Sequence, residues 1–176
     1  MLKNFADKQW DRNLQTRSRL LADQIVFIVG YGSIGRYAAT LISSIGATVV
    51  GVTRTGTEIS PDVEIIAEQA LMRRLPEADH IVLLLPGDSS TDRYMHPERI
   101  LACKPGVYLY NFGRGNALLS RDLIQCKDHI GGAFLEAHAG QKNAGAPGVV
   151  SARFVARSRV QMVEATQHLK VFLHPL

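Results

Sequence analysis

The sequence predicts an α/β fold in which helices alternate with the strands of a doubly wound parallel sheet. Three continuously apolar runs, at residues 25–29, 80–85 and 107–110, have the length and composition of parallel strands buried on both faces. A glycine-rich turn at residues 30–35 joins the first run to a segment with helical periodicity. The chain has 176 residues, of which 46% are hydrophobic, and this is enough for one core. We therefore expect a single domain of this class.

The glycine turn has the spacing G-x-G-x-x-G, with Gly30, Gly32 and Gly35 directly after the first strand. Gly30 would make the tight turn, Gly32 would let a phosphate approach the main chain, and Gly35 would let the helix pack closely on the strand. The free N–H groups at the N-terminus of that helix, together with its dipole, attract anions. The turn thus predicts a Rossmann-type site for the pyrophosphate of a dinucleotide, although glycines at this spacing also occur in ordinary turns.

The segment after the glycines completes a strand-turn-helix-strand unit. Gly46 stands where a left-handed residue would end a helix, and residues 48–52 predict a second buried strand. Between them, apolar residues recur at helical spacing, namely Ile34, Tyr37, Ala38, Leu41, Ile42 and Ile45.

The end of the second strand bears on the coenzyme, because a dinucleotide-binding fold contacts the adenosine ribose there. A site that prefers NAD places an Asp or Glu at this point, and the sequence has neither. Thr53 and Thr55 offer hydroxyls, and Arg54 offers a guanidinium suited to a 2′-phosphate. NADP(H) is therefore favoured over NAD(H), the alternative being that Arg54 only caps a loop.

The rest of the chain continues the alternation of strands and helices. Residues 62–66 predict an edge strand, and Pro86 stops the strand at 80–85. His80, which opens that strand, is expected to be a surface or hydrogen-bonded residue. The further predicted elements are helices at 67–75, 91–94, 97–102 and 120–126, a buried strand at 130–135, a flexible loop at 139–148 and a last strand at 149–151.

An amphipathic helix is predicted at each end of the chain. Residues 1–22 carry a thin apolar stripe that includes Trp10, and residues 155–176 carry a second stripe. Such stripes must pack on something, either across the domain or against a second subunit. We therefore divide the chain into the helix at 1–22, a dinucleotide-binding domain at 23–154 and the C-terminal helix at 155–176.

The strand at 107–110 leads into a loop that contains Arg114. Ligands of open parallel sheets bind beyond the carboxyl ends of the strands, so Arg114 is aimed at the same crevice as the glycine turn. An arginine there can hold a carboxylate in bidentate fashion and polarise a neighbouring carbonyl. A structural ion pair is the alternative role.

Composition argues against several other classes of protein. The net charge of +4 comes from dispersed basic residues and the aromatic content is only 7%, so no nucleic-acid surface is predicted. The apolar runs are too short to cross a bilayer, and the N-terminus lacks the apolar core of a signal peptide, which together predict a cytoplasmic protein without a membrane partner. Cys103 and Cys126 lack the spacing of a metal site and are expected to be reduced structural residues.

Several motifs occur in a characteristic order. They are the glycine turn, Leu85-Pro86, Cys103-Lys104-Pro105-Gly106 and Asn111-Phe112-Gly113-Arg114-Gly115-Asn116. Together they resemble the D-isomer-specific 2-hydroxyacid dehydrogenases, from about residue 10 to the C-terminus. The turn Thr53-Arg54-Thr55-Gly56 is most similar to the glyoxylate/hydroxypyruvate reductase branch of that family.

This resemblance implies a two-domain enzyme in which hydride passes between nicotinamide and a 2-oxo or 2-hydroxy acid. In that family, the arginine that matches Arg114 binds the carboxylate and carbonyl of the substrate. The positions that match cofactor contacts are Ser33 and Ile34 at the pyrophosphate, Leu85, Pro86, Phe112 and Gly113 around the adenosine and nicotinamide pockets, and Glu136, where an aspartate normally contacts the nicotinamide amide.

Departures from the family pattern concern proton transfer and the substrate. Arg153 stands where the family has its acid/base histidine, and an arginine keeps its proton at physiological pH. Residues 139–148 contain no Asp or Glu, although the family has there the carboxylate that orients this histidine. We also expect the substrate domain to be absent, so that nothing in this sequence would close over a substrate.

Three functions are consistent with these observations. The first, which we favour, is a domain that binds NAD(P)(H) but has lost hydride transfer. The second is an active oxidoreductase on a small 2-oxo or 2-hydroxy acid, with its substrate domain supplied by another chain and His138 or a water as proton donor. The third is a dimeric scaffold with a vacated cofactor pocket. Relatives in the family pair through this domain, so a homodimer is expected.

Overall fold

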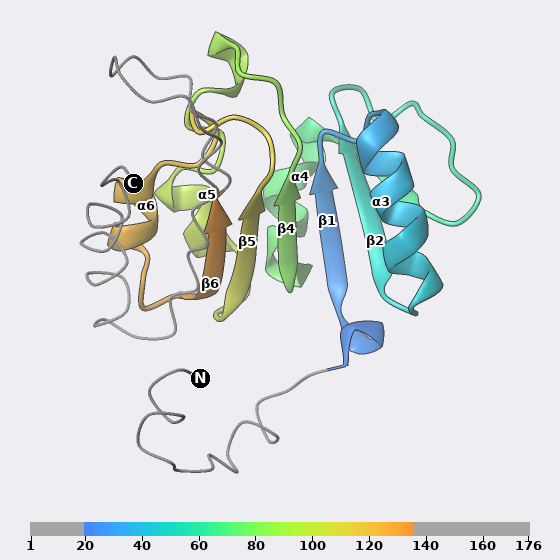
Figure 1. Ribbon diagram of the computed structural model, residues 1–176, viewed down its shortest axis with the longest axis horizontal. Coiled ribbons are helices and arrows are strands. Elements are labelled where there is room, and N and C mark those ends of the chain that lie inside the picture. The colour runs from blue at the N-terminus through green and yellow to red at the C-terminus, as the bar shows by residue number, and fades with distance from the viewer. Residues whose placement is uncertain (1–19, 136–176) are drawn as a thin grey trace, which may run out of the picture.

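A computed structural model describes residues 20–135 and shows a six-stranded, fully parallel sheet flanked by helices (Figure 1). The strand order is β3-β2-β1-β4-β5-β6, which is the Rossmann order. The predicted fold class is thereby confirmed. The strands are β1 (Ile25–Val29), β2 (Thr48–Thr53), β3 (Glu64–Ala67), β4 (His80–Leu83), β5 (Val107–Asn111) and β6 (Ile130–Leu135).

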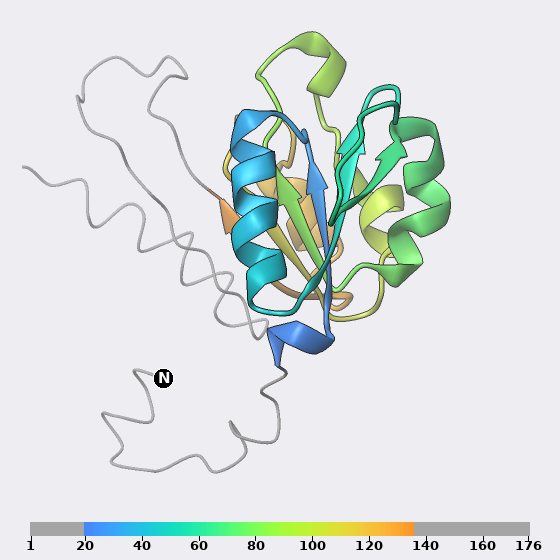
Figure 2. The same cartoon turned by 90° about the vertical axis from the view of Figure 1, so that its right-hand side faces the viewer.

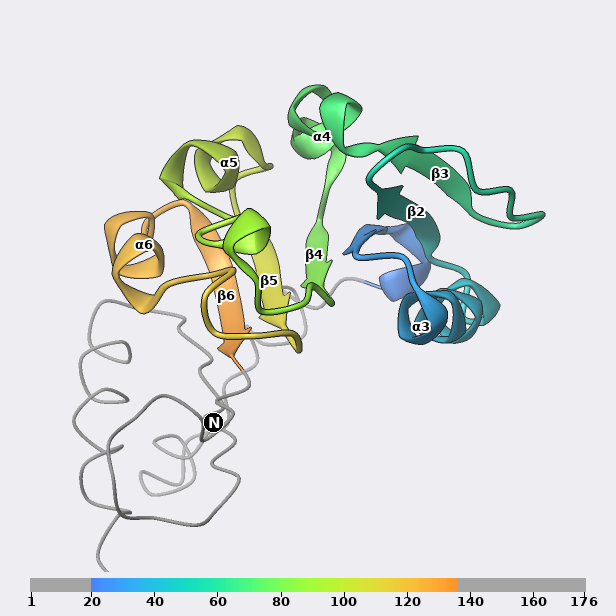
Figure 3. The same ribbon diagram turned by 90° about the horizontal axis from the view of Figure 1, so that it is seen from above.

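The helices lie on both faces of the sheet, as a doubly wound fold requires. Figures 2 and 3 show α3 on one face and α4 and α5 on the other. The α-helices are α3 (Ser33–Ser44), α4 (Glu68–Arg74), α5 (Pro97–Ala102) and α6 (Ser120–Gln125). Short 3₁₀ turns are η1 (Leu21–Asp23), η2 (Leu75–Glu77) and η3 (Ser89–Thr91). The helix predicted at 91–94 is thus this short turn, placed two residues earlier.

The main core fills the space between the sheet and α4, α5 and α6. Phe27 at the centre of β1, Leu83 on β4 and Leu109 on β5 are completely buried in it. Side chains alternate along a strand, so the neighbours of these residues point to the opposite face. There a smaller cluster forms under α3 and includes Ile28 and Val49.

The helix α3 forms where the sequence predicts it, but its fully buried residues are small, while Ala38 and Ile42 pack partly buried against the smaller cluster. Gly35 and Ala39 are its buried residues. A Cβ atom on Gly35 would lie 2.9 Å from the carbonyl oxygen of Gly30, so only glycine lets the helix approach β1 this closely. Four of the apolar residues with helical spacing are exposed instead, namely Ile34, Tyr37, Leu41 and Ile45.

Polar contacts at the amino-terminal edge of the sheet fix the starts of three strands. The Asp79 carboxylate accepts a hydrogen bond from the Ile25 N–H at 3.0 Å and pairs with Lys104 at 3.0 Å. Burial alone would raise the pKa of Asp79, but these two partners outweigh it and lower the pKa. His80 is hydrogen-bonded to Gln24 and to the Tyr110 hydroxyl, as its prediction allowed.

Both cysteines are buried free thiols, which confirms their predicted structural role. Burial raises the pKa of the Cys103 thiol to about 12 and also raises that of Cys126. Neither thiol is therefore a nucleophile at neutral pH.

Several predictions fall outside residues 20–135. These are the helices at 1–22 and 155–176, the loop at 139–148, the strand at 149–151, and the residues Glu136, His138 and Arg153.

None of the helices in the described range combines the length and apolar character needed to span a bilayer. Within that range, no group of three or more His, Cys, Asp or Glu side chains is placed to hold a metal ion.

Candidate functional site

The glycine turn leads from β1 into the N-terminus of α3. Gly30 has φ +91°, a conformation that side chains of L-residues rarely adopt, and it makes the turn. A Cβ on Gly32 would meet no atom within 4 Å, so the main chain is open to a ligand here. The N–H groups of Ser33, Ile34 and Gly35 donate no hydrogen bond to any residue in the range 20–135. These donors and the positive end of the helix dipole form a site for an anion.

Loops from three neighbouring strands meet at this turn. A Cβ on Gly30 would lie 2.7 Å from the Leu84 carbonyl oxygen, after β4. A Cβ on Gly113, after β5, would lie 2.5 Å from the Leu85 carbonyl oxygen. The main chains therefore touch where β1 and β4 lie side by side and their connections leave in opposite directions, which is the point where open α/β sheets bind ligands.

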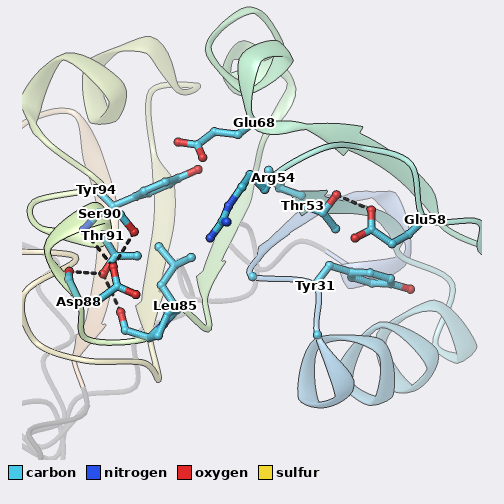
Figure 4. Close-up of a pocket in the computed structure, with 14 residues that line it drawn as sticks. Tyr31, Thr53, Arg54, Glu58, Glu68, Leu85, Asp88, Ser90, Thr91 and Tyr94 are labelled. Carbon is cyan, nitrogen blue, oxygen red and sulfur yellow. Dashed lines mark hydrogen bonds between the residues drawn. The ribbon is translucent and has the colours of Figure 1, made fainter.

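Two adjoining cavities flank the glycine turn and share Gly30, Gly32, Leu85 and Pro86. The first, which we name the β2-side cavity, has a volume of about 530 Å3. Besides the shared residues it is lined by Tyr31, Val52, Thr53, Arg54, Glu58, Glu68, Asp88, Ser90, Thr91 and Tyr94 (Figure 4). The second, the β5-side cavity, has a volume of about 430 Å3 and includes Ser33, Ile34, Gly35, Phe112, Gly113 and Arg114.

The β2-side cavity contains a carboxylate that sequence reasoning missed. Glu58 accepts a 2.6 Å hydrogen bond from the hydroxyl of Thr53, the last residue of β2. Gly56, with φ +71°, reverses the chain and brings Glu58 back to the end of the strand. No acid follows β2 directly at residues 54–56, but the fold brings the carboxylate of Glu58 to this end of the strand. A glycine followed by an acid two residues later is the only sequence signal that could have suggested it.

Arg54 points toward the middle of the β2-side cavity, whereas Glu58 lies on the other side of Thr53 (Figure 4). Arg54 makes no hydrogen bond or ion pair with the described part of the chain, although its charge contributes to the lowered pKa of Asp88. The stronger influence on that pKa is the hydrogen bond from Ser90. Thr55 lines neither cavity and instead forms a hydrogen bond with Thr57.

In the β5-side cavity, Asn111 organises the loop that carries Arg114. The Asn111 side chain is buried, and its amide donates to the Arg114 carbonyl at 2.8 Å while its oxygen accepts from the Gly113 N–H at 3.0 Å. The Arg114 side chain packs over Gly87, where a Cβ would lie 2.5 Å from Cγ of Arg114. Sequence reasoning named Arg114 but assigned no role to Asn111.

The predicted residues of the described range are thus brought together, with the exception of Thr55. Gly30, Gly32, Ser33, Ile34 and Gly35 form the turn between the cavities. Thr53 and Arg54 lie on one side of it, and Phe112, Gly113 and Arg114 on the other. The arrangement suits an extended ligand with a diphosphate at its centre and a ring system at each end.

Comparison with known proteins agrees with this geometry. Residues 1–158 match the family model of the D-isomer specific 2-hydroxyacid dehydrogenase, NAD binding domain. D-lactate dehydrogenase of Treponema pallidum is 30% identical over 134 residues, which are 75% of this chain and 39% of that protein. D-2-hydroxyacid dehydrogenase (NAD(+)) of Clostridioides difficile is 30% identical over 100 residues, covering 57% of this chain and 30% of that protein. The chain thus spans well under half the length of these relatives.

A solved structure has the same fold. NADPH-dependent glyoxylate/hydroxypyruvate reductase of Sinorhizobium meliloti superposes with a TM-score of 0.70 at 23% identity, covering 81% of this chain and 73% of that one.

Proposed function

Because the chain belongs to the D-isomer specific 2-hydroxyacid dehydrogenase family, whose NAD-binding domain it matches over residues 1–158, we propose that it binds a nicotinamide dinucleotide in the cleft formed by the two cavities. The observation that carries the proposal is the glycine turn between them, with three main-chain N–H groups that have no acceptor in the range 20–135. In this arrangement Ser33, Ile34 and Gly35 would bind the diphosphate.

The remaining contacts to the coenzyme are assigned from the two cavities on either side of the glycine turn. Adenosine would lie in the β2-side cavity beside Thr53 and Arg54, and nicotinamide in the β5-side cavity beside Phe112 and Gly113. Leu85 and Pro86 would contact the ligand from the β4 side. Glu136, by its match to the family, would contact the nicotinamide amide. Hydride chemistry would belong to the bound coenzyme, and the part that this chain would play is to hold and orient it.

Replacing Gly32 by alanine tests the proposal without disturbing the fold. Gly32 has φ −88° and open space at its Cβ, so Gly32→Ala should lower the free energy of unfolding by no more than about 1 kcal/mol, the cost of alanine at the N-cap of α3. The added methyl group would stand where the diphosphate approaches the main chain. We expect the dissociation constant for NADH or NADPH, measured by titration calorimetry, to rise by on the order of a hundredfold.

Gly115→Ala is the matched control, because a Cβ there also meets nothing within 4 Å and Gly115 lines neither cavity. It should bind the coenzyme like the wild type. Equal affinity in Gly32→Ala and Gly115→Ala would place the ligand elsewhere. Failure of the wild-type chain to bind either coenzyme would instead support the dimeric scaffold.

We further propose that the chain does not catalyse hydride transfer, because by the sequence resemblance Arg153 matches the family's acid/base histidine, and an arginine keeps its proton at physiological pH. The purified chain with NADH or NADPH and glyoxylate or hydroxypyruvate should show no loss of coenzyme absorbance. Turnover that disappears in Arg114→Ala would contradict this proposal and favour the active oxidoreductase. In that case Arg114 would hold the carboxylate of a 2-oxo acid.

A homodimer stays a prediction. The terminal helices on which it depends lie outside the described residues, but the exposed apolar residues of α3 offer a further surface for self-association. The cytoplasmic location likewise stays a prediction.

A further inference from the structure

We propose that Thr53 and Glu58 together select NAD(H) over NADP(H) by recognising the free 2′-hydroxyl of the adenosine ribose. This inference rests on the proposed function, because it presumes that adenosine occupies the β2-side cavity. It replaces the preference for NADP(H) that the sequence favoured. The inference is based on the hydrogen bonds of the Thr53 hydroxyl and on the negative charge of the neighbouring Glu58 carboxylate.

The hydroxyl of Thr53 already donates one hydrogen bond and accepts one within the protein. Its proton is donated to Oε2 of Glu58 at 2.6 Å, and its oxygen accepts from the Gly56 N–H at 2.9 Å. A hydroxyl has one proton and two lone pairs, so its one remaining capacity is to accept. A ribose 2′-hydroxyl can donate a hydrogen bond to Thr53, whereas a 2′-phosphate at neutral pH acts mainly as an acceptor and finds no donor there.

Glu58 reinforces this choice through its charge. The hydrogen bond from Thr53 lowers the pKa of Glu58, and the positive charge of Arg36 on α3 adds to the effect, so the group is an anion at neutral pH. The Thr53–Glu58 pair therefore places at the end of β2 the negative charge that an Asp or Glu supplies directly in an NAD-selective site. A dianionic 2′-phosphate would be repelled by it.

Arg54 would favour NADP(H), because its guanidinium suits a 2′-phosphate. The carboxylates around it favour NAD(H) instead. Of the residues in the range 20–135 that line the β2-side cavity, Arg54 is the one with a cationic side chain, against the carboxylates of Glu58, Glu68 and Asp88. Glu68 is paired with Arg99 at 3.3 Å, which reduces its effect, but Asp88 lies close enough to Arg54 to have its pKa lowered by it. Asp88 thus adds a negative charge to the lining of the cavity, although it forms no ion pair with Arg54.

The experiment measures dissociation constants for NADH and NADPH by titration calorimetry, for the wild type and Glu58→Gln. The wild type should bind NADH at least several-fold more tightly than NADPH. Glutamine keeps an oxygen that can accept from Thr53, removes the charge and replaces the second carboxylate oxygen by an NH₂ group. We expect Glu58→Gln to bind NADPH about tenfold more tightly than the wild type does, with NADH affinity unchanged to within about threefold.

Glu98→Gln is the matched control, since it makes the same chemical change at an exposed position of α5 outside both cavities. It should leave the ratio of the two affinities unchanged. A wild type that prefers NADPH, or an unchanged ratio in Glu58→Gln, would overturn the inference while leaving coenzyme binding intact. Absence of binding by either coenzyme in every variant would overturn the proposed function as well.

Discussion

Replacing Gly30 by alanine should cost the protein about 3 kcal/mol of unfolding free energy and abolish measurable coenzyme binding. The new Cβ would lie 2.7 Å from the oxygen and 2.9 Å from the carbon of the Leu84 carbonyl. Both atoms belong to the main chain that follows β4, so no side-chain rotation can relieve the collision. The backbone also has φ +91°, which adds its own strain for any residue with a Cβ. The turn would have to move away from β4, and with it the donors at the start of α3.

Gly106→Ala separates the cost of the backbone conformation from the cost of the collision with the Leu84 carbonyl. Gly106 has φ +88°, nearly the same backbone conformation, but a Cβ there meets nothing within 4 Å. It should therefore cost only the backbone strain, about 1 to 2 kcal/mol, and bind NADH normally. Urea denaturation monitored by circular dichroism gives both free energies. Equal losses in the two variants would mean that the contact between Gly30 and Leu84 is not limiting.

Replacing Phe27 by alanine should have the largest effect on stability, about 3 to 5 kcal/mol. Phe27 is completely buried at the centre of β1, in register with Val50 on β2 and Ile81 on β4. Removing its ring leaves a cavity in the middle of the main core, where neighbouring strands cannot collapse without breaking their hydrogen bonds. Because a domain of this size is stable by only about 5 to 15 kcal/mol, the variant should be close to unfolding.

Ile59→Ala, at a side chain that is 98% exposed, is the control and should change stability by less than about 0.5 kcal/mol. Thermal denaturation gives the comparison. If the cleft binds NADH, coenzyme at a hundred times its dissociation constant should restore about 2.7 kcal/mol to Phe27→Ala. A loss below about 1 kcal/mol in Phe27→Ala would show that the core is less closely packed around β1 than the structure indicates.

The central strands and the glycine turn could be predicted because each is a local property of the chain. A continuous apolar run such as residues 25–29 is explained only by burial on both faces, and three glycines at fixed spacing specify a main-chain turn. Arg114 could be placed at the same edge of the sheet because it follows the end of a strand, whereas Ser33 and Ile34 were predicted from their match to the D-isomer-specific 2-hydroxyacid dehydrogenases. The sequence therefore also predicted at which edge of the sheet the residues after each strand lie.

The side of α3 that faces the sheet could not be obtained in this way. The periodicity of Ile34, Tyr37 and Leu41 indicates a helix with an apolar stripe, and such a stripe is ordinarily the buried one. In the structure the fully buried residues of α3 are Gly35 and Ala39, and a Cβ on Gly35 would already lie 2.9 Å from the Gly30 carbonyl oxygen, while Ala38 and Ile42 are partly buried beside them. Packing distance decided the orientation, and periodicity carries no information about distance.

By itself, then, the sequence determined the parallel α/β fold, the glycine turn that leads into α3 and the position of Arg114 after β5, because short-range patterns encode backbone conformation and burial. Only the tertiary structure placed Glu58 against Thr53 and set Gly113 against the Leu85 carbonyl. These contacts join residues whose separation in space depends on the path of a loop or on the spacing of neighbouring strands. No local pattern specifies that path, and for this reason the pairing of Thr53 with Glu58, which we propose selects the coenzyme, could be found only in the tertiary structure.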